Sequence, residues 1–199
     1  MKPILFNTEM VRAILDGRKT VTRRVVKPQP EGVHTILDCD EDAHTFDLLC
    51  GNCGAGGIFA DWSETIKAPY WHGDILYVRE TWCKGKIRGE KERYFYKADG
   101  SLEYPCNWSP SIHMPREAAR IFLRVTDVRV ERLQDIDDNG VVSEGLKIGA
   151  PFDELWDSTI KKSDLPIYGW DANPWVWVIS FRRISKVEAQ KGGEEANNE

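Results

Sequence analysis

The sequence predicts a single α+β domain whose β-sheet curls into a small barrel. Short segments rich in β-branched and aromatic residues are scattered along the chain, and a few amphipathic segments with helical spacing lie between them. The 199 residues are enough for one domain with a sizeable core, and no internal repeat is visible. We expect this domain to cover residues 1–185 and the polar residues 186–199 to form a disordered tail.

The amino-terminal segments alternate strand, helix and strand. Residues 2–7 form an apolar strand, and Asn7 or Thr8 can cap a helix that runs through Asp16 and ends at Gly17. Residues 20–26 are rich in β-branched side chains and predict a second strand, which Pro28 ends.

Residues 31–69 differ in composition and predict an insertion. They are acidic and glycine-rich, and their clearest pattern is a possible hairpin made of residues 34–39 and 44–49. Cys39, Cys50 and Cys53 with a nearby histidine could hold a structural zinc ion. The chain has a single C-x-x-C pair, so we prefer reduced thiols and expect no metal and no other cofactor.

The rest of the chain supplies the remaining strands and helices. We expect strands over residues 73–82, 93–100 and 119–133, then two helical stretches after Leu133, the second over residues 151–162. The last strand covers residues 173–184. The aromatic and aliphatic residues Trp175, Trp177, Ile179 and Phe181 alternate along it and predict one buried face.

Composition limits the function classes. The net charge of −5 argues against a protein that coats nucleic acid through bulk charge, although local basic patches stay possible. No apolar run reaches the roughly 18 residues of a membrane span, so we expect a soluble cytoplasmic protein without membrane partners. Five cysteines without a signal peptide make a disulfide framework unlikely and reduced thiols the expectation. The oligomeric state is left open.

The segment GRKTVTRR, residues 17–24, concentrates positive charge in an acidic chain. Thr22 and Arg24 stand two apart on a strand and so share a face, and Lys19 can reach the same place from the preceding turn. An arginine fork suits a phosphate, carboxylate or carbonyl oxygen, and a lysine beside another cation has its pKa lowered. The alternative is a solvated basic edge strand that charge protects against aggregation.

Two motifs resemble the signature of the ASCH domain, a relative of the PUA fold. The first is G-x-K-x-x-T-x-R, formed by Gly17, Lys19, Thr22 and Arg24. The second is GDILYVRETW, a strand that ends at Glu80. Residues 108–136, 152–158 and 173–184 look like segments of the longer ASCH-like proteins of bacteriophages and prophages, so the resemblance covers nearly the whole chain except the insertion and the tail.

The resemblance implies a PUA-like barrel with a cleft for a nucleobase or RNA. Some small bacterial ASCH proteins are amidohydrolases that remove the acetyl group from N4-acetylcytidine, and their lysine, threonine and glutamate match Lys19, Thr22 and Glu80. A further functional arginine matches Arg24. Other ASCH proteins bind or cleave RNA, and this chain departs from the small amidohydrolases in its insertion and its extra carboxy-terminal helices.

The matched residues suit acyl transfer. Lys19 could take the proton of Thr22, whose oxygen attacks an amide carbonyl, or Thr22 could position an attacking water. Arg24 would stabilise the oxyanion. Glu80 would hold the lysine or protonate the leaving nitrogen, although a structural pair with Arg79 or Arg24 is the alternative for this carboxylate.

Three further side chains are candidates for substrate binding. Arg23 adds a cation to the turn, and Trp82 and Trp108 could stack on a base, although tryptophans often belong to the core. The sequence therefore predicts an RNA or nucleoside ligand and a hydrolase of an N-acylated base. The alternatives are a non-catalytic reader of RNA or modified nucleic acid, a ribonuclease, and a phage accessory protein that acts on a host protein.

Overall fold

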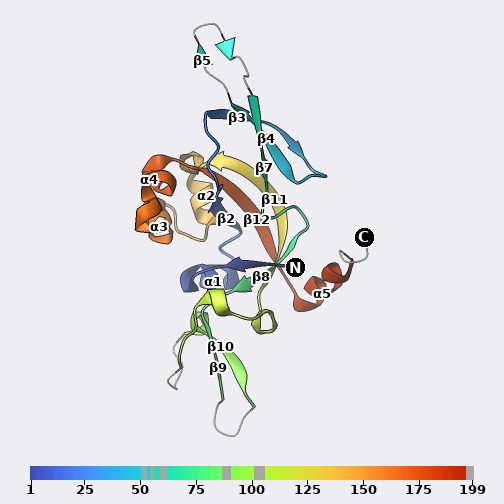
Figure 1. Ribbon diagram of the computed structural model, residues 1–199. Helices are drawn as coiled ribbons and strands as arrows, with labels where there is room; N and C mark the ends of the chain where they lie inside the picture. The colour runs from blue at the N-terminus through green and yellow to red at the C-terminus, as the bar shows by residue number, and fades with distance from the viewer. Residues whose placement is uncertain (51–52, 55–56, 59–61, 87–90, 101–105, 196–199) are drawn as a thin grey trace.

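The computed structural model describes residues 1–50, 53–54, 57–58, 62–86, 91–100 and 106–195, and gives only the backbone at 33–38, 49–50, 53–54, 57–58, 62–63 and 193–195. A five-stranded sheet forms the centre of the fold (Figure 1). Its spatial order is β1 (Lys2–Leu5), β8 (Ile75–Arg79), β11 (Phe122–Arg132), β12 (Trp175–Ile184) and β2 (Val21–Val25). The β1–β8 pair is parallel and the other pairs are antiparallel, so the predicted α+β class is confirmed.

The sheet is buried on both faces. On β12, the predicted face of alternating large residues lies in the main core with Ile4, Val78 and Val125. The opposite face, carrying Val176 and Val178, packs under a layer of helices. The helices that follow β11 therefore bury the second face of this strand.

Helix α1 (Thr8–Leu15) begins and ends where the sequence predicts. The Asn7 side chain caps it by accepting a hydrogen bond from the Met10 amide at 2.9 Å. Gly17 follows the helix in a left-handed conformation with φ +76°. Val11 and Ile14 bury one face in the main core. The helix delivers the chain into the basic turn, whose Lys19 amide donates to the Ala13 carbonyl at 3.0 Å.

Helices α2 (Asp138–Ser143) and α3 (Phe152–Thr159) cover the outer face of β2 and β12. The short helix α4 (Leu165–Tyr168) follows them and was not predicted from the sequence. Phe152 and Trp156 of α3 pack against the sheet. The chain between these elements makes short 3-10 turns at Lys97–Asp99, Ser111–His113, Arg116–Ala118, Leu133–Asp135, Lys162–Asp164 and Trp170–Ala172.

The insertion forms a second antiparallel sheet. Its strands are β3 (Val33–Asp40), β4 (Thr45–Cys50) and β7 (Trp62–Lys67), with the small pair β5 (Cys53–Gly54) and β6 (Gly57–Ile58) beyond them (Figure 1). The β3–β4 hairpin is the one the sequence predicts. Phe46, Leu48 and Ile66 join the main core, so this sheet packs on the domain through one apolar face.

The hairpin of β9 (Trp82–Gly85) and β10 (Arg93–Tyr96) lies at the other end of the molecule (Figure 1). A disulfide joins Cys83 of β9 to Cys106. This corrects the expectation of reduced thiols for these two residues, because the fold brings together two cysteines that lie 23 positions apart in sequence.

The carboxy-terminal segment differs from its prediction. Helix α5 (Lys186–Glu195) occupies most of the region expected to be a disordered tail, and residues 196–199 lie outside the described part. Ala189 is fully buried in a cluster with Ile75 and Phe122. Small side chains let this helix approach the sheet closely.

No described helix has the length and apolar character needed to cross a membrane.

The expected small barrel is not closed in the described residues. Strands β1 and β2 are the two edges of the sheet and do not pair with each other. One side chain spans the gap, because Arg24 Nη2 donates to the Leu5 carbonyl at 2.7 Å. We call this place the seam.

Gly145 provides a test of how α2 is fixed against the basic turn. It has φ +94°, and a Cβ there would lie 2.8 Å from Ala13 Cβ and 3.0 Å from Lys19 Cβ. We expect Gly145→Ala to lower the free energy of unfolding by about 2–4 kcal/mol in urea denaturation. Gly149→Ala is the control, since Gly149 has φ +75° with nothing within 4 Å, and should cost about 1–2 kcal/mol. Equal losses would contradict this packing.

The disulfide gives a second prediction. Cys106→Ala should lower the free energy of unfolding by about 2–4 kcal/mol, because it frees a long loop in the unfolded chain. Unfolding of the unmodified protein in the presence of a dithiol reductant should show the same loss. The disulfide would be disproved if thiol labelling under denaturing, non-reducing conditions modified both Cys83 and Cys106.

Candidate functional site

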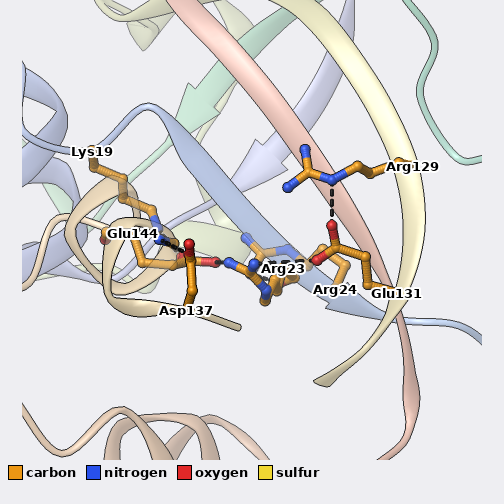
Figure 2. Close-up of polar contacts among 8 residues, drawn as sticks. Lys19, Arg23, Arg24, Arg129, Glu131, Asp137 and Glu144 are labelled. Carbon is orange, nitrogen blue, oxygen red and sulfur yellow. Dashed lines mark hydrogen bonds and ion pairs between the residues drawn. The ribbon is translucent and has the colours of Figure 1, made fainter. Parts of the chain in front are cut away.

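The basic turn buries its lysine against a carboxylate from α2. Lys19 is 2% exposed, and its Nζ donates to the Glu144 carboxylate and, at 3.1 Å, to the Glu144 backbone carbonyl (Figure 2). Glu144 is the C-cap of α2, and the backbones of Lys19 and Glu144 form an isolated bridge. Burial lowers the pKa of Lys19 below its ordinary value, while Glu144 opposes this shift and the nearby Arg24 and Arg23 add to it.

The second oxygen of Glu144 faces Arg23. Arg23 is buried, and its two terminal nitrogens lie 3.4 Å from Glu144 Oε1 and 3.4 Å from Glu131 Oε2 (Figure 2). Glu131 also pairs with Arg129. The Nε of Arg23 is buried and has no hydrogen-bond partner among the described residues. Glu144, Arg23, Glu131 and Arg129 thus form a continuous series of ion pairs. Arg23 has the least complete hydrogen bonding among them.

Alternation along β2 separates Arg23 from the other predicted residues. Thr22 lies opposite Ile179 and Arg24 opposite Trp177, both of which belong to the main core. Arg23 lies opposite Val178, on the face covered by helices. Thr22 and Arg24 therefore share a face, as the spacing predicts, and Thr22 is only 1% exposed.

The aromatic ring of Phe6 connects the two cations of the motif. Lys19 Nζ lies 5.7 Å and the Arg24 guanidinium carbon 5.2 Å from the centre of this ring. Contacts of this kind are attractive because the ring face is electron-rich. The structure therefore brings Lys19, Thr22 and Arg24 together.

Two neighbouring cavities lie beside these residues. The outer cleft has a volume of about 590 Å³ and runs along the seam. Its polar lining comes from Arg24, Tyr70, Asn7, Thr81, Ser111 and Ser158. The inner cavity has a volume of about 20 Å³, and Thr22, Arg23 and Glu144 are among its lining residues. Met10, Arg24 and Thr159 line both cavities, so the two adjoin there.

Glu80 lies in a different network from Lys19. The guanidinium of Arg120 holds both of its carboxylate oxygens, with contacts of 2.9 Å and 3.0 Å, and also reaches Asp99. Burial raises the pKa of Glu80 despite this pairing, and Lys19 is not among the charges that act on it. Glu80 directly precedes Thr81 of the outer cleft, but its carboxylate is held in an arginine pair, although the partner is Arg120 and not the Arg79 or Arg24 that the sequence suggested.

The two candidate tryptophans lie away from both cavities. Trp82 packs against the second core cluster with its ring edge-on to Tyr94, and its backbone pairs with Ser109. Trp108 is half-buried beside this bridge. Neither residue lines the outer cleft or the inner cavity. Their stacking role stays a prediction without support from this geometry.

Two of the three cysteines in the zinc hypothesis, Cys50 and Cys53, have side chains outside the described part of the structure. Cys39 lies on β3 and is exposed. Among the described side chains, no group of three or more histidine, cysteine, aspartate or glutamate residues is placed to hold a metal ion.

Sequence reasoning missed the partner carboxylate Glu144 and the arginine Arg120. Glu144 lies 125 positions from Lys19, and no local spacing links them. One available signal was Gly145, because a glycine directly after a short helix marks the end of that helix. The residue before it, Glu144, then occupies a fixed position at the helix end. Arg120 was visible only as a charged residue near the start of a predicted strand.

Comparisons with known proteins give little guidance. No family model and no curated protein matches the chain. The crystal structure of protein EF3133 from Enterococcus faecalis V583, of family model DUF984, is similar over 93% of this chain and 82% of that one, with 10% identity and a TM-score of 0.43. The ASCH resemblance therefore depends on the sequence motifs alone and stays a prediction.

The buried ion pairs give a testable prediction. Glu144→Ala leaves Lys19 and Arg23 buried without their shared carboxylate and should lower the free energy of unfolding by about 3–5 kcal/mol. Glu9→Ala is the control, because Glu9 forms an exposed ion pair with Arg12 and should cost less than about 1 kcal/mol. Urea denaturation measures both. Similar small losses would show that Glu144 is not the shared partner.

Proposed function

We propose that the protein hydrolyses the amide of an N-acylated nucleobase, with the base bound in the outer cleft and the acyl group directed toward Lys19 and Thr22. This is the activity expected from the ASCH-like motifs, and a PUA-like arrangement of the sheet is part of the proposal. The observation that carries it is that Arg24 lines both cavities where they adjoin, with Thr22 and Glu144, the partner of Lys19, in the wall of the inner cavity.

The roles follow from the chemistry of each group. Arg24 has one terminal nitrogen on the Leu5 carbonyl and lines both cavities, so its remaining donors can stabilise an oxyanion formed between them. Burial lowers the pKa of Lys19, which favours its use in proton transfer. Thr22 supplies a hydroxyl as nucleophile or as the group that positions water.

The carboxylate role passes to Glu144 in this proposal. Glu144 contacts Lys19 directly, whereas Glu80 is held by Arg120. Glu80 then has a positioning role, since it fixes the start of the segment that carries Thr81 into the outer cleft. A carboxylate beside the lysine is what the proton transfers require.

Burial favours this hydrolase over a non-catalytic reader of nucleic acid. A reader would use the cations of the motif to hold phosphates, and phosphate contacts need charge at an accessible surface. Lys19 and Arg23 are 2% and 4% exposed and already face carboxylates. These two cations are therefore poorly placed for a polymer backbone, while Arg24 and Thr22 line the cavities and stay available to a small acyl group.

The proposal predicts turnover of N4-acetylcytidine, measured as cytidine released by chromatography. Thr22→Val and Lys19→Met should each reduce kcat/KM at least about 100-fold, because each removes a group that acts in the reaction. Thr20→Val is the matched control, since Thr20 is exposed in the same turn and should keep full activity. Absence of product at high enzyme concentration would reject hydrolysis of this substrate.

A further inference from the structure

Arg23 is incompletely paired. Both of its ion-pair contacts measure 3.4 Å, which is beyond the usual range of a hydrogen bond between nitrogen and oxygen. Its Nε is buried and meets no acceptor among the described residues. A buried N–H group without an acceptor is costly and rare in folded proteins. An acceptor atom from outside the protein is therefore expected beside Arg23.

The inner cavity has the size and the lining to supply that acceptor. Its volume of about 20 Å³ exceeds the roughly 10–15 Å³ that one water molecule requires. Thr22, Arg23 and Glu144 give it polar walls, and the remaining wall includes Phe152 and Trp156. A buried water is stable when it has two to four polar partners, which these walls provide.

We propose that the inner cavity binds a single water molecule, held by Arg23 Nε, the Thr22 hydroxyl and the Glu144 carboxylate, and that this water is the nucleophile of the hydrolysis. The nucleophilic role rests on the function proposed above, whereas the water site does not. The cavity adjoins the outer cleft at Arg24, so an acyl carbonyl at the end of the cleft meets the water beside an oxyanion donor.

The proton transfers balance with two residues. Glu144 takes a proton from the water as its oxygen bonds to the carbonyl carbon, and the protonated Lys19 gives a proton to the amide nitrogen as the carbon–nitrogen bond breaks. The products are a carboxylic acid and the free amine of the base. Glu144 then returns the proton to Lys19 across their direct hydrogen bond, which restores both groups. Thr22 positions the water and forms no covalent bond.

A high-resolution crystal structure of the unliganded protein tests the water site independently of activity. We expect one peak of solvent density within hydrogen-bond distance of Arg23 Nε and of Thr22 or Glu144. Thr22→Val keeps the shape of the side chain and removes one partner, so the peak should weaken. A Glu131→Gln control should retain it, since Glu131 contacts Arg23 but does not line the cavity. A wild-type map without density there would overturn the site.

The pH dependence of N4-acetylcytidine turnover tests the nucleophilic role. The charged groups that act on Lys19 are Glu144 from α2 and Arg23 and Arg24 from β2, and together with burial they leave its pKa lowered. If Lys19 is the acid, kcat/KM falls as the pH rises through that pKa. If Lys19 is instead the base that activates Thr22, kcat/KM rises over the same range, which would overturn the role of the water.

Mass spectrometry of the quenched reaction gives a second, independent outcome. We expect no acetylated protein during turnover, and an acetyl group on Thr22 would overturn direct attack by water. Solvent density without any turnover would overturn both the nucleophilic role and the proposed function but leave the water site. Turnover without density would overturn the water site and leave the proposed function. The failures of the two proposals are therefore distinguishable.

Discussion

The Glu144 carboxylate is the contact on which the arrangement of the basic segment depends. Two cations, Lys19 and Arg23, are buried on either side of it, and neither could leave water without a nearby negative charge. The same residue ends α2, and the Thr20 amide donates to the Ser143 carbonyl just before it. One side chain therefore fixes a helix end, a turn and an edge strand relative to one another.

This arrangement explains why β2 can be an edge strand and still be buried. Helices α2 and α3 cover its outer face, where Arg23 lies between Glu144 and Glu131. Its inner face carries Thr22 and Arg24 toward the main core and the seam. The strand thus carries charged side chains on both faces and is not the solvated basic edge of the alternative interpretation. Its arginines contact other groups of the protein and line the cavities.

Local patterns predicted the elements whose cause is local. Helix α1 follows from the cap at Asn7 and the stop at Gly17, and the strands follow from β-branched and alternating residues. The hairpin of the insertion was also visible. The convergence of Lys19 and Arg24 could be expected because a turn and two alternate strand positions determine it.

Features that depend on distant partners could not be read in this way. Helix α5 packs through Ala189 and lies close to Ile75 at Gly192, so no stripe of large apolar residues marks it. The pairing of Glu80 with Arg120 and of Lys19 with Glu144 was equally open, because any carboxylate in the chain was a possible partner. The family motif indicated Glu80 for the lysine, and the long-range packing of α2 brought Glu144 there instead.

The seam has a mechanical consequence for the whole sheet. A continuous ladder of backbone hydrogen bonds resists bending, whereas β1 and β2 are held across the seam by the Arg24 side chain on the Leu5 carbonyl. A ligand that drew this guanidinium away would release that tie without breaking any strand pairing. The spacing of β1 and β2 beside the outer cleft therefore depends on this side-chain contact, and a bound ligand that moved Arg24 would change it.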